Sequence, residues 1–344
     1  MANDVSTGLG KTNADLATWE VYADGMPVTG TSDQHTNCWT GADLGPVQLS
    51  GFGTPTAVLY PRIYAADGEA HDATNAATGC YLVVVSGGNG IDLDTVNYVR
   101  IEHLRIEMPS LAGGGTGLFC RTTNNTTFDS ILVRITGGHV GTCYGWASSC
   151  TTGGGAQNNI LKNCIVYGTG AGTAEWGFYF YSNSDGRPCT AALYNNSAYL
   201  MLRGLYVGNT SSGAPVITGT NNACLESGTD YGKTAASTIT LTYSVSADDT
   251  ADDWGGAGNQ INKSAAACWD TPSTNVIPLA AGPLENAGIA LGAVTEDAIG
   301  TARNDPPEVG AIELASAGQP MPKRFINIRF AGANLHSGLG RRVG

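Results

Sequence analysis

The stretch that decides the fold is "NNILKNCIVYG" (158–168), which places Asn163 and Cys164 between two apolar runs. A polar amide is uncommon inside a buried strand, so the pair marks a special position such as a corner. Similar stretches recur along the chain, which predicts a repeated structural unit. They are "YVRIEHLRIEM" (98–108), "TFDSILVRITGG" (127–138), "AALYNNSAYL" (191–200) and "TITLTYSVSAD" (238–248).

Aligned by eye, these stretches share one position that lies between apolar neighbours. The spacings along the chain are 27, 33, 32 and 48 residues, and the last leaves room for an extra repeat through "APVITGTNNACLES" (214–227). Uneven periods of this length predict a parallel β-helix of roughly eight to ten coils. A β-sandwich is the second interpretation. The shared position is occupied by Leu104, Ile131, Cys164, Asn196 and Ser244.

Amide side chains at a corner of stacked coils can bond from one coil to the next. Equivalent positions in adjacent coils lie ~4.8 Å apart, so amides there form ladders at little steric cost. Asn163, Asn195 and Asn196 are the candidates. Ordinary turn asparagines are the alternative.

The composition favours an all-β fold and excludes several classes of function. Charged residues make up only 13% and glycine contributes 48 residues, which suits short strands and many turns better than exposed helices. The net charge of -12 argues against nucleic acid or an acidic membrane surface as a partner. The chain has no apolar run of ~18 residues and no signal-peptide pattern at its start, so we expect synthesis in the cytoplasm and no membrane span. We also expect no cofactor and no metal site.

The nine cysteines fit neither a zinc pattern nor a disulfide framework. Several lie inside apolar runs, as Cys120 and Cys164 do, which indicates small buried side chains. A loop disulfide between Cys143 and Cys150 is the alternative for that pair.

The two ends differ from the middle and predict three parts: residues 1–50 as a cap and first turns, 51–314 as the β-helix body, and 315–344 as a basic arm. "NADLATWEVYAD" (13–24) predicts a short helix with Asp15 as its N-cap, which could cover the open end. The arm carries +5 against -17 for the rest of the chain, so we expect it to dock on an acidic surface of its own body or of a neighbouring subunit. "TARNDPPEVGAIEL" (301–314) predicts a turn followed by a brief strand. The arm residues expected to make contacts are Lys323, Arg324, Phe325, Ile328, Arg329, Phe330, Arg341 and Arg342.

Two groups of residues are candidates for chemistry on the outer surface. The alignment puts Glu102 beside Asp129 on adjacent coils, and paired carboxyl groups cleave glycosidic bonds. Ion-pair ladders with Arg100, Arg105 and Arg134 are the structural alternative. Aromatic side chains are candidates for contact with a glycan or a partner, with core packing as the alternative: Trp176, Tyr179 and Tyr181 in one strand, and Trp254 beside the aspartates of "DDTADDW" (248–254).

Three segments resemble right-handed parallel β-helix proteins of tailed phages, which have the pectin-lyase-like architecture. They are "GLGKTNADLATWE" (8–20), "NYVRIEHLRIE" (97–107) and "ARNDPPEVGAIE" (302–313), the last with Glu308-Val309 and Ile312 where the family has Asp-Ile and Tyr. The resemblance implies a virion structural protein, such as a decoration, fibre or tail component, that assembles as a homo-oligomer, commonly a trimer, with other virion proteins. The alternatives are a tailspike-type polysaccharide depolymerase or lyase, and a non-catalytic β-helix that binds bacterial surface glycan.

Overall fold

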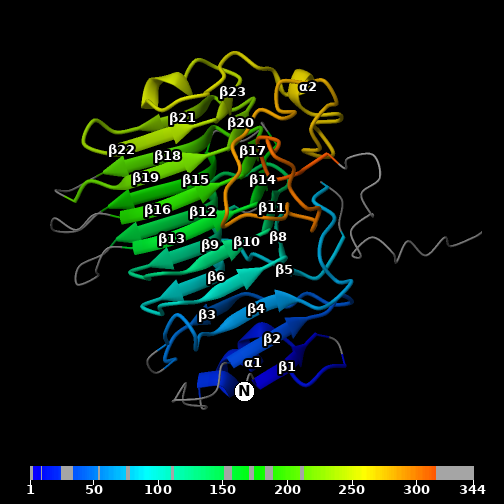
Figure 1. Ribbon diagram of the computed structural model, residues 1–344. Coiled ribbons are helices and arrows are strands. Elements are labelled where there is room, and N and C mark those ends of the chain that lie inside the picture. Colours follow the sequence, from blue (N-terminus) through cyan, green and yellow to red (C-terminus); the bar gives the residue numbers. More distant parts are fainter. Residues whose placement is uncertain are drawn as a thin grey trace, which may run out of the picture.

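The protein is mostly β, and each of its strands runs parallel to its neighbours in one of three sheets (Figure 1). A computed structural model describes residues 3–8, 10–24, 34–52, 55–74, 78–109, 112–150, 157–169, 174–182, 189–209 and 213–314. Figure 1 shows the strands stacked one above another, from β1 at the N-terminal end to β22 and β23 at the other.

Sheet A has nine strands and sheets B and C have seven each. In spatial order, sheet A contains β1 (Asn3–Thr7), β2 (Gln34–Cys38), β4 (Arg62–Ala65), β7 (Arg100–Glu102), β10 (Thr127–Asp129), β13 (Gln157–Lys162), β16 (Cys189–Tyr194), β19 (Val216–Thr220) and β22 (Thr238–Thr242). Sheet B contains β23 (Val245–Ser246), β20 (Ala223–Leu225), β17 (Ser197–Tyr199), β14 (Ile165–Tyr167), β11 (Leu132–Ile135), β8 (Arg105–Met108) and β5 (Tyr81–Val83). Sheet C contains β21 (Thr229–Lys233), β18 (Arg203–Asn209), β15 (Glu175–Ser182), β12 (Cys143–Cys150), β9 (Gly115–Arg121), β6 (Asn89–Asp94) and β3 (Val47–Leu49).

From β7 onward the chain visits sheets A, B and C in turn, and we call each such pass a coil. This order fits a parallel β-helix and contradicts the β-sandwich, whose sheets are antiparallel. The register confirms the repeat alignment, because Phe128 pairs with Ile101 on one side and with Leu161 on the other. The extra repeat predicted within 214–227 is also confirmed, since it forms β19 and β20.

The pair Asn163–Cys164 of the deciding stretch is a two-residue bend between β13 and β14. Its first residue adopts a left-handed conformation, with φ of 56° at Asn163, 53° at Asn195 and 57° at Asn221. Asparagine tolerates this conformation better than most residues, so these are turn asparagines. We call Asn163, Asn195 and Asn221 the turn asparagines below.

The second residue of each bend forms a hydrogen-bonded ladder inside the stack. The Cys164 N–H donates to Asn196 Oδ1 at 2.9 Å, and the Asn196 N–H donates to Asn222 Oδ1 at 3.0 Å. The Asn222 N–H in turn donates to Ser244 Oγ at 3.3 Å, and the Ser244 N–H to Asn259 Oδ1 at 3.0 Å. Asn196 is therefore a ladder residue as predicted, whereas the prediction was wrong for Asn163 and Asn195.

The space between the three sheets is filled by apolar side chains that stack from coil to coil. The Trp146 ring meets the Phe128 ring edge-on, with 5.8 Å between the ring centroids. It is tilted against the Phe180 ring, whose centroid lies 4.4 Å away. Cys120 and Cys164 are buried free thiols, as predicted, and burial raises the pKa of Cys164 to about 12. The Cys143–Cys150 disulfide was wrong: Cys143 is a free thiol, and the two residues form opposite ends of β12, too far apart for a bond.

The outer face of sheet B is also buried, because the segment after β23 packs against it (Figure 1). That segment includes α2 (Ala265–Cys268) and contributes Trp269, Leu284 and Ile312 to a second apolar cluster with Ile165 and Tyr167. A strand covered on both faces needs apolar residues at successive positions, which explains the run Ile165–Tyr167. The brief strand predicted within 301–314 was wrong, since that segment has no strand.

A buried charged cluster fastens this segment to the stack. The Arg303 guanidinium pairs with Glu313 at 3.1 Å, and it donates to Asn163 Oδ1 at 2.9 Å and to the Gly310 carbonyl at 3.0 Å. The Glu313 N–H donates to Asp297 Oδ2 at 2.9 Å. The motif 302–313 therefore has a structural role in this chain, and we call Asp297, Arg303, Glu308 and Glu313 the clamp.

The clamp predicts that stability falls as pH rises. Burial, together with the neighbouring Glu313 carboxyl group, raises the pKa of Glu308 from 4.5 to about 8. The folded state then keeps a proton that the unfolded state has lost, so Glu308 contributes fully below pH ~4.5 and its contribution is lost as pH rises to ~8. Chemical denaturation between pH 5 and 9 should show this decline, and Glu308→Gln should flatten it. An unchanged slope in that variant would assign the decline to another group, such as Asp230, whose pKa burial raises to about 7.

The predicted N-terminal helix is confirmed as α1 (Leu16–Asp24). The Thr18 N–H donates to Asp15 Oδ1 at 2.7 Å, which makes Asp15 the N-cap as expected. Leu16 and Trp19 are fully buried in the apolar core, and α1 contacts β3 at the N-terminal end of the stack (Figure 1).

Candidate functional site

The outer face of sheet A holds the predicted carboxylate pair. Glu102 and Asp129 are direct neighbours on β7 and β10, so their Cα atoms lie roughly one strand spacing, ~4.8 Å, apart. Both line a pocket of about 230 Å³ together with Lys162 and Tyr194. The repeat alignment therefore predicted correctly that Glu102 and Asp129 are neighbours.

Each of these carboxylates is engaged by a cation. Arg62 Nη2 lies 2.5 Å from Glu102 Oε2, and Lys162 Nζ lies 2.9 Å from Asp129 Oδ2. Glycoside hydrolysis requires one carboxyl group that donates a proton to the leaving group, whereas both of these carboxylates are engaged as acceptors in ion pairs. The expected ion-pair alternative holds in kind but with other cations. Arg105 and Arg134 both pair with Glu107, and the Arg100 guanidinium carbon lies 4.0 Å from the centre of the Tyr60 ring.

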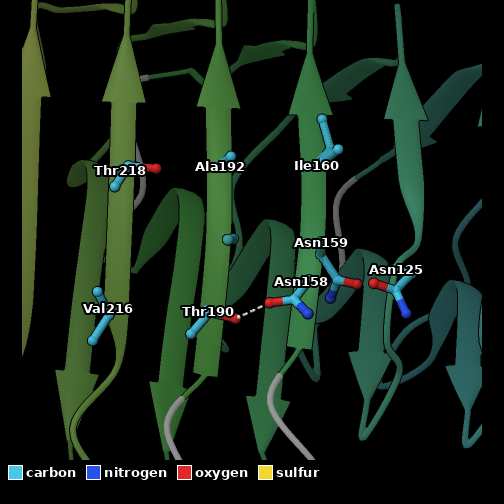
Figure 2. Close-up of a pocket in the computed structure, with 9 residues that line it drawn as sticks. Asn125, Asn158, Asn159, Ile160, Thr190, Ala192, Val216 and Thr218 are labelled. Atoms are coloured by element: carbon cyan, nitrogen blue, oxygen red, sulfur yellow. Dashed lines mark hydrogen bonds between the residues drawn. The ribbon is translucent and has the colours of Figure 1, made fainter.

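Beside this pocket, sheet A has a second hollow of about 450 Å³ that no sequence motif predicted. Figure 2 shows Ile160, Ala192 and Thr218 side by side on β13, β16 and β19, next to a row formed by Asn158, Thr190 and Val216. Thr190 Oγ1 donates to Asn158 Oδ1 at 3.0 Å. In the sequence, the only sign of this hollow is the alternation of β13, which exposes Asn158 and Ile160.

The outer face of sheet C carries a cluster of aromatic rings that joins three neighbouring strands. Tyr179 stacks on Tyr144 at 5.1 Å and on Tyr181 at 4.9 Å, in both cases with 14° between the ring planes. Trp176 meets Tyr179 edge-on at 4.5 Å and Tyr206 at 5.3 Å. All five rings are partly exposed. We call these five residues the aromatic face.

One cation lies on the aromatic face. The Arg203 guanidinium carbon is 3.8 Å from the centre of the Tyr206 ring and 4.3 Å from that of Trp176. Among the described residues no carboxylate pairs with Arg203, so its charge is available to an anion. Strand glycines leave room for the rings: a Cβ atom at Gly232 would lie 2.9 Å from Tyr206, and one at Gly208 would lie 3.1 Å from Tyr179.

The remaining predicted contacts lie elsewhere. Trp254 is in the short 3₁₀ helix Asp252–Trp254, where its indole N–H donates to the Tyr231 carbonyl at 3.4 Å and its ring packs against the core. Asp248 accepts the Asp230 N–H at 3.0 Å, so this aspartate caps the end of the stack. Trp254 makes no ring contact with the aromatic face in the described part of the chain. The arm residues 323–342 lie outside the described residues.

Two further features are absent from the part of the chain that the structure describes. No group of three or more His, Cys, Asp or Glu side chains is placed to hold a metal ion there. None of the helices in those ranges has the length and apolar character needed to cross a membrane.

No protein-family model matches the chain, and no curated protein matches it. The three parallel sheets fit the parallel β-helix that was predicted from the sequence.

Proposed function

We propose that this protein is a structural component of a tailed-phage particle, with a pectin-lyase-like right-handed β-helix and α1 covering its N-terminal end. It assembles as a homo-oligomer, a trimer, and its basic arm joins it to a neighbouring subunit in the virion. A parallel β–β crossover is right-handed in nearly all proteins, which supports the handedness.

The observation that carries the proposal is that the described residues use their polar groups to hold the stack together. The ladder through Asn196 and Asn222 bonds one coil to the next, and Glu102 and Asp129 are both held in ion pairs. This arrangement suits a rigid scaffold better than hydrolysis. The charge division between the acidic body and the +5 arm gives the assembly contact.

The test is the mass in solution of the full chain and of a truncation that ends at Leu314. We expect a trimer or larger for the full chain and a monomer for the truncation, measured by analytical ultracentrifugation. Equal masses would contradict an assembly role for the arm. The mass should be salt-dependent, because an acidic body and a basic arm attract less at high ionic strength.

The aromatic face favours a second function, the binding of an acidic glycan. Aromatic rings with a free arginine supply an apolar surface and a cation within one site, which suits a sugar that bears a carboxylate. The hydroxyl group of Tyr179 stays neutral at physiological pH, because burial and the neighbouring tyrosines raise its pKa to about 12. This hydroxyl group can then both donate and accept a hydrogen bond.

For this second function we expect the full chain to bind alginate, a polyuronate, more tightly than uncharged dextran in calorimetric titrations. Trp176→Ala should weaken alginate binding by roughly 10- to 100-fold, as expected for a central aromatic contact. Arg203→Gln should remove the preference for alginate over dextran. Tyr22→Ala, at an exposed ring of α1, is the matched control and should bind as the unchanged chain does. Equal affinities in all four proteins would show that alginate does not bind at the aromatic face.

A further inference from the structure

The three turn asparagines occupy equivalent places in successive coils and face the segment that covers sheet B. Asn221 holds the main chain of that segment, since its Nδ2 donates to the Ile289 carbonyl at 2.8 Å and its Oδ1 accepts the Ile289 N–H at 3.0 Å. Asn163 Nδ2 likewise donates to the Glu296 carbonyl at 2.9 Å, while its Oδ1 accepts a hydrogen bond from the Arg303 side chain. Both side chains therefore act as receptors for peptide groups.

Asn195, between them, has no such contact. Its side chain is fully buried, yet neither Nδ2 nor Oδ1 has a hydrogen-bond partner among the described residues. It lines a cavity of about 250 Å³ whose other walls come from the covering segment, including Leu291, Val294 and Pro307. Buried amides are nearly always hydrogen-bonded, so this one has a partner that the described residues do not supply.

We propose that this cavity is the docking site for the C-terminal arm, residues 315–344, of a second copy of the chain. The inference rests on the proposed function, because it names the surface to which the assembly arm binds. Asn195 would hold one peptide group of the arm with a donor and an acceptor, as Asn221 holds Ile289. The segment "RFINIRF" (324–330) has the alternating pattern of an extended strand, which presents such peptide groups.

Electric charge and chain length both support the arm of a second copy as the occupant of the cavity. Outside the clamp, residues 284–314 carry three acidic residues that remain partly or fully exposed, Glu285, Glu296 and Asp305, whereas the arm contains five basic residues and no acidic one. The Ala311 N–H donates to Ser197 Oγ at 3.0 Å, two residues from Asn195, so the described chain ends near the cavity. An extended arm of 30 residues spans up to about 100 Å, enough to reach a neighbouring subunit.

The test uses Asn195→Gly in the full chain, with Asn125→Gly as the matched control. Both asparagines are left-handed turn residues, with φ of 53° and 58°, so glycine fits either position without strain. Asn125 is exposed and lines the sheet A hollow, away from the cavity. Losing two hydrogen bonds should raise the dissociation constant of the oligomer by about 10-fold or more in Asn195→Gly and leave it unchanged in Asn125→Gly.

A mixing experiment assigns the arm to the second copy. Asn195→Gly subunits still offer an arm, and subunits truncated at Leu314 still offer the cavity, so a mixture should form hetero-oligomers at concentrations where neither assembles alone. Failure of the mixture to assemble would overturn docking between copies. If Asn195→Gly assembles normally while the truncated chain does not, the arm docks at another site and only water contacts Asn195. The proposed function would then stand. If truncation also changes nothing, the proposed function itself fails.

Discussion

Replacing Arg303 by methionine will lower the free energy of unfolding by about 3 to 5 kcal/mol, the usual cost of removing one partner of a buried ion pair. The guanidinium is almost fully buried and pairs with Glu313, whose side chain is also inaccessible to solvent. Without it, Glu313 and Asp297 are left in the interior, and no other cation among the described residues pairs with them. The hydrogen bonds to Asn163 and to the Gly310 carbonyl are lost as well.

Chemical denaturation at pH 8 measures this loss, and Arg121→Met is the matched control. Arg121 pairs with Asp92 at 2.5 Å, but its side chain is 38% exposed, so its removal should cost no more than about 1 kcal/mol. The effect of Arg303→Met should shrink at lower pH, because burial raises the pKa of Asp297 and protonation of this carboxyl group relieves its unpaired charge. Equal losses for the two arginines would show that the clamp does not stabilise the fold.

The second large effect concerns the internal ladder. Asn222→Ala should lower the free energy of unfolding by about 3 kcal/mol or more, because several buried polar groups lose their partner at ~1 to 3 kcal/mol each. Asn222 Oδ1 accepts both the N–H and the Nδ2 group of Asn196, at 3.0 Å each. Its Nδ2 donates to the Leu193 carbonyl at 3.0 Å. The loss of these hydrogen bonds should weaken the neighbouring coils as well, because the ladder connects successive coils.

Denaturation and hydrogen exchange together check this prediction. The Asn196 amide should exchange faster in Asn222→Ala, since its acceptor is gone. Asn222→Ser should recover part of the loss, because Ser244 fills the equivalent place in the next coil. Asn158→Ala, at an exposed asparagine, should change stability by less than about 0.5 kcal/mol. A loss in Asn222→Ala no larger than in that control would mean that the ladder contributes little.

The sequence predicted the parts of the fold that repeat. Side chains that stack from coil to coil must share size and polarity, so Phe128 and Leu161 could be aligned before their pairing was known. The same alignment placed Glu102 beside Asp129. It failed to name their cations, because Arg62 belongs to β4, a strand outside the aligned repeats, and Lys162 differs in type from the residues aligned with it.

The aromatic face was only partly predictable. Alternation within β15 predicted that half of its aromatic residues point outward, and it places Tyr179 and Tyr181 on one face but Trp176 on the other. Trp176 joins them because Gly177 and Phe178 are both buried, which breaks the alternation. Tyr144, Tyr206 and Arg203 come from β12 and β18, and only the register of sheet C brings them to the same surface. Trp254 was grouped with them on composition, yet it packs at the end of the stack.

The sequence by itself determined the short strands, the bends and the helix cap at Asp15, because these depend on local conformation and on a period that can be read along the chain. The tertiary structure decided which face of each sheet is covered. The apolar run Ile165–Tyr167 is compatible with one buried face or two, and only the packing of Trp269 and Ile312 across sheet B shows that both are buried. The tertiary structure also decided the roles of the paired asparagines. Asn195 and Asn196 are chemically identical neighbours, but the left-handed bend at Asn195 turns its side chain toward the covering segment and places Asn196 in the ladder.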